Sequence, residues 1–182
     1  MILKQFMLLL SHIIYSKGTN MEESNSSEYS NRMIEAFIDK PEVSLWYQNA
    51  FATFNVNGVD AMKWKWSWWA CFSGFLFLLY RKQYIASLFL FIASISIGLF
   101  FPFSIILMVL SGGFSTYFIY KGYKTKLKEI EAIVPDEEKR IETMRAIGGY
   151  NQWVVWAYGV LVTLIFLGII AAILIPKVAL AQ

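Results

Sequence analysis

The sequence predicts an all-α membrane protein with about three transmembrane helices, a Trp-rich re-entrant or interfacial helix and amphipathic cytoplasmic helices. Of the 182 residues, 57% are hydrophobic and only 16% are charged, whereas about a quarter are charged in soluble domains. From residue 66 to residue 120 the only charged side chains are Arg81 and Lys82, and residues 153–175 carry no charge. So small a chain cannot bury this much apolar surface in its own core, so lipid must cover part of it.

The amino-terminal region divides into a short hydrophobic helix, residues 1–17, and a flexible polar linker, residues 18–40. Three interpretations of the first segment remain open: an interfacial anchor, an uncleaved signal-like segment, or an extension upstream of a start at Met21. The second segment is rich in Ser, Asn and Glu and has little to bury. Within it, a brief helical turn is expected at residues 32–38.

A firmer helix is predicted from Pro41 to about Phe54. Proline suits the first helical position, and Glu42 lies in the first turn, where the helix dipole favours an acid. Turn chemistry at residues 55–58 ends the helix. Two alternative apolar faces have the i, i+3/i+4 spacing of a helix: Val43, Trp46, Ala50 and Phe54, or Trp46, Tyr47, Phe51 and Phe54.

The Trp-rich stretch and the apolar run after it complete a predicted domain over residues 41–120. Residues 64–80 would form a helix of about 25 Å, short for a hydrocarbon core of about 30 Å. The following run is too long for one span and suits a transmembrane hairpin of helices 84–100 and 103–120, with Pro102 near its tip.

Residues 121–147 are predicted to form charged amphipathic helices, divided at Pro135 and ended before Gly148. A lysine-rich helix directly after a span favours a surface helix held by anionic lipid. Residues 152–176 are predicted to form the carboxyl-terminal transmembrane helix, which ends at Pro176.

The positive-inside rule decides how the spans are threaded. If the Trp-rich stretch crossed fully, the lysines after residue 120 would lie outside. If it only enters and returns, Arg81, Lys82 and the lysines of residues 121–128 all lie in the cytoplasm. We therefore predict three spans, the amino terminus inside and the carboxyl terminus outside, with the tryptophans in the cytoplasmic aromatic belt.

The residue inventory restricts the chemistry. With one cysteine, Cys71, and one histidine, His12, no His/Cys metal cluster can form, and no cofactor is expected. The net charge of +3 comes without a separate basic patch, so no nucleic-acid partner is expected. The carboxylates between residues 129 and 138 fit a solvated, salt-bridged surface better than a lipid-modifying active site.

Residues 66–84 resemble a bacterial membrane family known as domain of unknown function 2628, and the resemblance extends over about residues 45–150. The positions that match its aromatic, glycine and Tyr-Arg-Lys pattern are Trp68, Ala70, Phe72, Gly74, Tyr80, Arg81, Lys82 and Tyr84. The chain departs from that pattern at Phe75, where the family has proline, and at Phe77, where it often has tryptophan; a proline would have explained a bend. The resemblance implies a membrane location and no known activity.

Membrane anchoring is the role predicted for the family motif, namely Trp64, Trp66, Trp68, Gly74, Tyr80, Arg81, Lys82 and Tyr84. In this interpretation Arg81 and Lys82 reach toward headgroup phosphates with their long side chains.

The sequence favours a non-enzymatic scaffold or accessory subunit in the bacterial inner membrane. Its expected partners are anionic lipid headgroups and either a membrane protein or a second copy of the chain. The alternative is a small channel or transporter component, for which Arg81 and Lys82 are the only candidate intramembrane charges.

Overall fold

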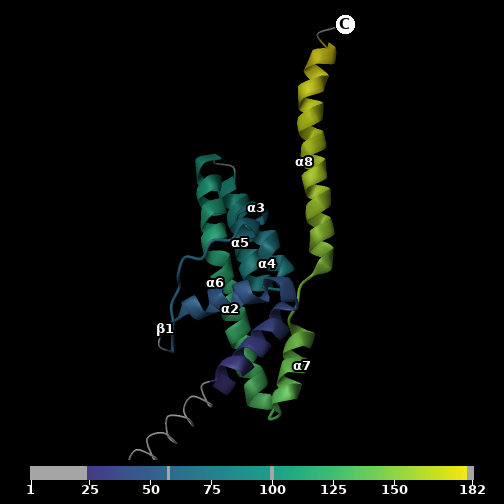
Figure 1. Ribbon diagram of the computed structural model, residues 1–182. Coiled ribbons are helices and arrows are strands. Elements are labelled where there is room, and N and C mark those ends of the chain that lie inside the picture. The colour runs from purple at the N-terminus through teal and green to yellow at the C-terminus, as the bar shows by residue number, and fades with distance from the viewer. Residues whose placement is uncertain (1–23, 57, 99–100, 180–182) are drawn as a thin grey trace, which may run out of the picture.

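The computed structural model describes residues 24–56, 58–98 and 101–179, and this part of the chain is mostly helical. The elements gather around α6, except that α8 extends away from them toward the carboxyl terminus (Figure 1). After a helix over residues 24–38 come α2 (Pro41–Phe54), β1 (Asn55–Val56), β2 (Val59–Asp60), α3 (Trp68–Ser73), α4 (Phe75–Tyr80), α5 (Tyr84–Gly98), α6 (Phe101–Ile133), α7 (Glu137–Ile147) and α8 (Gln152–Ala179). β1 and β2 pair in antiparallel register, with Asn55 opposite Asp60.

The linker predicted for residues 18–40 is wrong from residue 24 onward, because residues 24–38 form a helix. Its second half buries Met33, Phe37 and Ile38 completely or nearly so. Near its middle, Arg32 attaches the helix to α7 by donating to Glu138 at 2.7 Å. A few apolar residues are enough to stabilise this helix, because they pack against the core formed by α2 and α6. The prediction for residues 1–17 and the question of Met21 lie outside the described residues.

Helix α2 begins at Pro41 and ends at Phe54, as predicted. The second of the two apolar faces is the buried one, except that Trp46 stays 38% exposed. The rings of Phe51 and Phe54 each lie 5.4 Å from the Tyr120 ring of α6. Burial of such aromatic pairs is a large part of the core energy of a small domain.

Helix α6 is continuous over 33 residues, so the predicted division between a span ending at residue 120 and a separate basic helix is wrong. Nothing between Lys121 and Ile133 interrupts a helix, and a change from apolar to charged residues does not end one. The break at Pro135 is confirmed: the side chain of Asp136 caps α7, and Gly148 ends it.

Two helices of the described chain, α6 and the helix that contains α8, are long and apolar enough to cross a membrane. Helix α5 is apolar but shorter. The most apolar stretch of the α8 candidate is only 6% buried, against 44% for α6. Protein therefore covers almost none of α8.

The Trp-rich stretch is a broken helical hairpin and not one continuous helix. Gly74, with φ +53° and ψ −123°, separates α3 from α4. Ser111 of α6 donates to the carbonyl of Ala70 at 2.8 Å, and Ser87 of α5 donates to the carbonyl of Phe75 at 2.9 Å. Helix α3 thus packs on α6, and α4 packs on α5.

An extended segment before α3 lies directly on the Gly112-Gly113 pair of α6. The backbone amides of Lys65 and Ser67 donate to the carbonyls of Gly113 and Gly112, at 3.0 and 2.8 Å. A Cβ atom on Gly113 would lie 2.5 Å from the Trp64 ring, and one on Gly112 would lie 3.0 Å from the Trp66 ring. Only glycine allows this approach.

We expect Gly113→Leu to displace the Trp64 ring and lower the free energy of unfolding by about 1–3 kcal/mol, as overpacking does elsewhere. Gly159→Leu is the matched control, because nothing lies within 4 Å of its Cβ position. Thermal unfolding of both variants in detergent measures the effect. Equal melting temperatures would contradict the proposed packing.

Candidate functional site

The turn between α4 and α5 carries Arg81, which holds the carboxyl end of the first described helix. Its side chain is 5% exposed, and its Nη1 donates to the carbonyl of Ile38 at 3.0 Å. The guanidinium carbon lies 4.9 Å from the Tyr47 ring centroid and 5.2 Å from that of Tyr80. A cation at a helix carboxyl end opposes the negative end of the helix dipole and supplies donors to open carbonyls.

Lys82, the next residue, does the same for α7. Its Nζ donates to the carbonyl of Gly148, and Nζ of Lys126 donates to the carbonyl of Ile147 at 2.8 Å. The amide of Gly149 completes the junction by donating to the carbonyl of Phe37 at 2.8 Å. Two helix ends and one turn therefore meet at a single point.

Asn151 attaches the start of α8 to the same region. Its backbone amide donates to the carbonyl of Tyr80 and its side-chain amide to the carbonyl of Leu79, both at 2.8 Å. These bonds use carbonyls at the end of α4 that have no partner within that helix.

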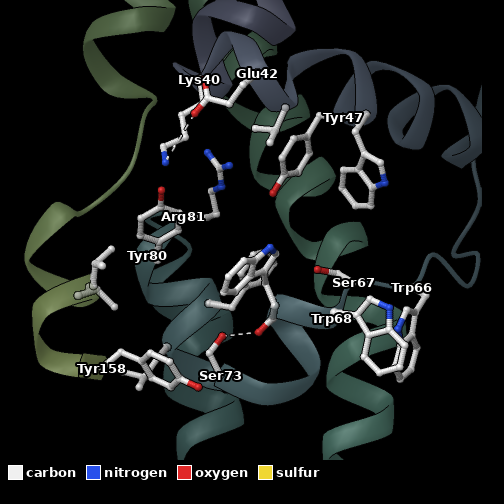
Figure 2. A pocket seen from close by; sticks show the side chains of 17 residues that line it. Lys40, Glu42, Tyr47, Trp66, Ser67, Trp68, Ser73, Tyr80, Arg81 and Tyr158 are labelled. Carbon is white, nitrogen blue, oxygen red and sulfur yellow. Dashed lines mark hydrogen bonds and ion pairs between the residues drawn. The ribbon is translucent and has the colours of Figure 1, made fainter. Parts of the chain in front are cut away.

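A cavity of about 670 Å³ lies beside this junction, between α2, the α3–α4 hairpin and α8. Figure 2 shows Lys40, Glu42 and Arg81 at one end and Ser73 and Tyr158 at the other. Aromatic rings form much of the wall between them. The residues that line it are Lys40, Glu42, Val43, Trp46, Tyr47, Trp66, Ser67, Trp68, Trp69, Ser73, Leu76, Phe77, Tyr80, Arg81, Val154, Val155 and Tyr158.

The polar end of the cavity is cationic. A side-chain hydrogen bond with Tyr80 raises the pKa of Lys40, so its ammonium stays charged. Burial raises the pKa of Tyr47, whose phenol therefore stays neutral beside Arg81. Glu42 is the one carboxylate in the lining, with Oε1 4.0 Å from Nζ of Lys40 and a side chain 66% exposed.

Two buried N–H groups in the lining have no acceptor among the described residues: Nε of Arg81 and Nε1 of Trp66. A buried donor without a partner costs about 1–3 kcal/mol, and such groups mark places where a ligand can supply acceptors.

The structure brings together part of the predicted motif. Trp66, Trp68, Tyr80 and Arg81 line the cavity, and Gly74 forms the turn of the hairpin. The other members lie outside the lining: Trp64 on Gly113, Lys82 on Gly148, and Tyr84, whose hydroxyl accepts from Asn151 at 3.3 Å.

The structure gives Arg81 a protein partner that the predicted anchoring role does not include. Its guanidinium is buried and bound to the carboxyl end of the first described helix, and Arg81 also lines the cavity. The anchoring role itself stays a prediction. Sequence reasoning assumed an exposed side chain, because it had taken residues 18–40 as a linker and so lacked the helix end that binds Arg81.

Sequence reasoning also missed Lys40 and Tyr158 as members of the site. Lys40 precedes Pro41, and a base directly before a helix start resembles an ordinary loop residue. Tyr158 is one of the few polar groups in an otherwise apolar span, which is a faint signal at best.

Comparison with protein families matches residues 22–125 to a family described as protein of unknown function (DUF2628). The chain belongs to this family. No curated protein and no solved structure matches the chain. The DUF2628 match begins earlier than the resemblance predicted and ends earlier, within α6. It therefore includes the helix over residues 24–38, Lys40 and Arg81, whereas α7 and α8 follow it.

We expect Arg81→Gln to release the first described helix while leaving membrane insertion unchanged. A hydrogen bond from a charged donor contributes about 1.5–3 kcal/mol, and the stacking on Tyr47 is lost with it. Limited proteolysis should then cut faster between residues 24 and 54, which mass spectrometry of the fragments would show. Lys63→Gln, an exposed lysine, is the control. Loss of membrane insertion with unchanged proteolysis would contradict this expectation and support the predicted anchoring role of Arg81.

Proposed function

We propose that this DUF2628 protein is an integral membrane protein without enzymatic activity, acting as a scaffold or an accessory subunit. The observation that carries the proposal is the exposure of α8. Most of its large apolar side chains between Trp153 and Ile173 are exposed, by 41–74% of their surface, although Val154 is buried. Lipid is the medium in which so long an apolar surface is stable.

The proposed topology has three spans, α5, α6 and α8, and a re-entrant α3–α4 hairpin. The order of the hydrogen bonds supports the hairpin. Ser67 and Ala70 bond to Gly112 and Ser111, so α3 runs antiparallel to α6. Phe75 and Leu78 bond to Ser87 and Gln83, so α4 runs antiparallel to α5. Helix α5 has 15 residues, about 22 Å, and is short for a core of about 30 Å. Local thinning of the bilayer accommodates such a length. The α3–α4 hairpin enters and leaves the membrane on the same side, whatever the depth of α5.

Charge placement supports a cytoplasmic amino-terminal region and an external carboxyl terminus. Arg81 and Lys82 lie at the base of the α5–α6 hairpin, and the lysines that follow residue 120 lie at the same end, since a Cβ on Gly122 would meet the Gln83 side chain. The positive-inside rule places this end in the cytoplasm. A bacterial inner membrane, implied by the sequence resemblance, completes the proposal.

Two features of the structure support a role in binding over catalysis or transport. The carboxylates Glu137 and Glu138 pair with Arg32 on the surface. Arg81 and Lys82, the candidate intramembrane charges of a transporter, bind helix ends. These two charges are therefore engaged in packing, which argues against their lining a transport path across the membrane.

Cysteine labelling tests the topology, starting from a Cys71→Ser chain, which has no other cysteine. In bacterial cells, Glu142→Cys on α7 should react with an impermeant maleimide only after the membrane is opened. An alkaline phosphatase fused after residue 182 should be active. Labelling of Glu142→Cys in intact cells, or an inactive fusion, would contradict the proposed threading.

A further inference from the structure

We propose that the cavity between α2, the α3–α4 hairpin and α8 binds one anionic lipid, with its phosphate at Lys40 and Arg81. This inference rests on the proposed membrane location and adds a specific ligand to it. The bound lipid would fasten α8 to the rest of the fold, since both line the cavity.

The cavity has the polarity of a lipid molecule. Its cationic end, at Lys40 and Arg81, lies next to the turn that begins α5, and the rest of its lining includes Leu76, Val155 and Tyr158. Figure 2 shows the Arg81 guanidinium extended toward Lys40, with Tyr158 at the opposite end. A volume of about 670 Å³ is within the usual range for small-molecule sites. A headgroup phosphate and the upper part of an acyl chain fit this arrangement.

The donors at the site suit a ligand that accepts hydrogen bonds. Nε of Arg81 and Nε1 of Trp66 are buried and have no acceptor in the described chain, and the Arg81 residue is 5% exposed. Lys40 adds an ammonium whose ion pair with Glu42 spans 4.0 Å. A phosphate brings several acceptor oxygens and a negative charge, which this set of donors lacks.

The remaining lining explains why the ligand is a lipid and not a soluble anion. Trp68 and Trp69 are 63% and 78% exposed, and they line the same cavity as α8, the helix with almost no protein cover. Tryptophan favours the membrane interface, where one end of the ring is apolar and the other polar. The cavity therefore opens toward the bilayer, from which a lipid can enter sideways.

Quenching of tryptophan fluorescence by brominated lipid tests the proposal, because four tryptophans line the cavity. The full chain, carrying Trp153→Phe and Trp156→Phe to remove exposed reporters on α8, is reconstituted in phosphatidylcholine vesicles. Brominated phosphatidylglycerol is then added at low mole fraction. We expect saturable quenching that an equal fraction of brominated phosphatidylcholine does not give. Equal quenching by the two lipids would overturn the proposal.

Substitutions separate the site from general surface charge. Lys40→Gln should weaken the apparent affinity for phosphatidylglycerol about tenfold, equivalent to about 1.4 kcal/mol, and Lys40→Arg should retain it. Lys63→Gln removes the same charge at an exposed position outside the lining and should change nothing. Equal losses in Lys40→Gln and Lys63→Gln would overturn the site.

A second variant and a soluble competitor complete the test. Val155→Phe, at an exposed lining position, narrows the apolar end and should reduce quenching even if Lys40→Gln fails to fold. Glycerol phosphate, a headgroup without a chain, should not displace the brominated lipid at millimolar concentration. Displacement would identify a soluble anion and overturn the lipid. If labelling confirms the topology while quenching shows no selectivity, only the lipid inference fails.

Discussion

The junction of Arg81 and Lys82 with two helix carboxyl ends is the interaction on which the rest of the structure depends. Each helix end has carbonyls that no residue of the helix can satisfy, and here two such ends converge on adjacent side chains. The bond between Arg81 and the Ile38 carbonyl is hard to break, because a buried guanidinium that loses its partner costs more free energy than the bond itself contributes. The first described helix and α7 are thus held to the base of the α5–α6 hairpin.

This junction also changes the meaning of the charges in the motif. The sequence predicts that Arg81 and Lys82 set the orientation of the chain in the membrane by interacting with lipid phosphates. In the structure they lie at the same end of the bundle as the basic half of α6, as the proposed orientation requires. Their partners, however, are the carbonyls of Ile38 and Gly148. The pair therefore holds two helix ends, and in the proposed topology it also contributes to the orientation.

Local signals predicted the parts of the fold that local chemistry decides. Pro41 begins α2, and Pro135 separates α6 from α7, because proline removes a donor and fixes the backbone wherever it occurs. Of the helix over residues 24–38, only a turn at residues 32–38 was predicted, because its stability comes from the core of α2 and α6 and not from its own composition. The cavity was missed for a related reason: Lys40, Arg81 and Tyr158 are far apart in sequence and meet only through the tertiary fold.

The Gly112-Gly113 pair explains how an extended segment can lie against a long apolar helix. Irregular backbone is stable in apolar surroundings only where protein satisfies its polar groups. Here the bare helix surface lets the amides of Lys65 and Ser67 reach carbonyls of α6, while the Ser111 hydroxyl binds the carbonyl of Ala70. The rings of Trp64 and Trp66 then cover the same surface. The tryptophans that suggested an interfacial belt thus cover a backbone junction, and the packing of the α3–α4 hairpin depends on α6 having no side chains at these two positions.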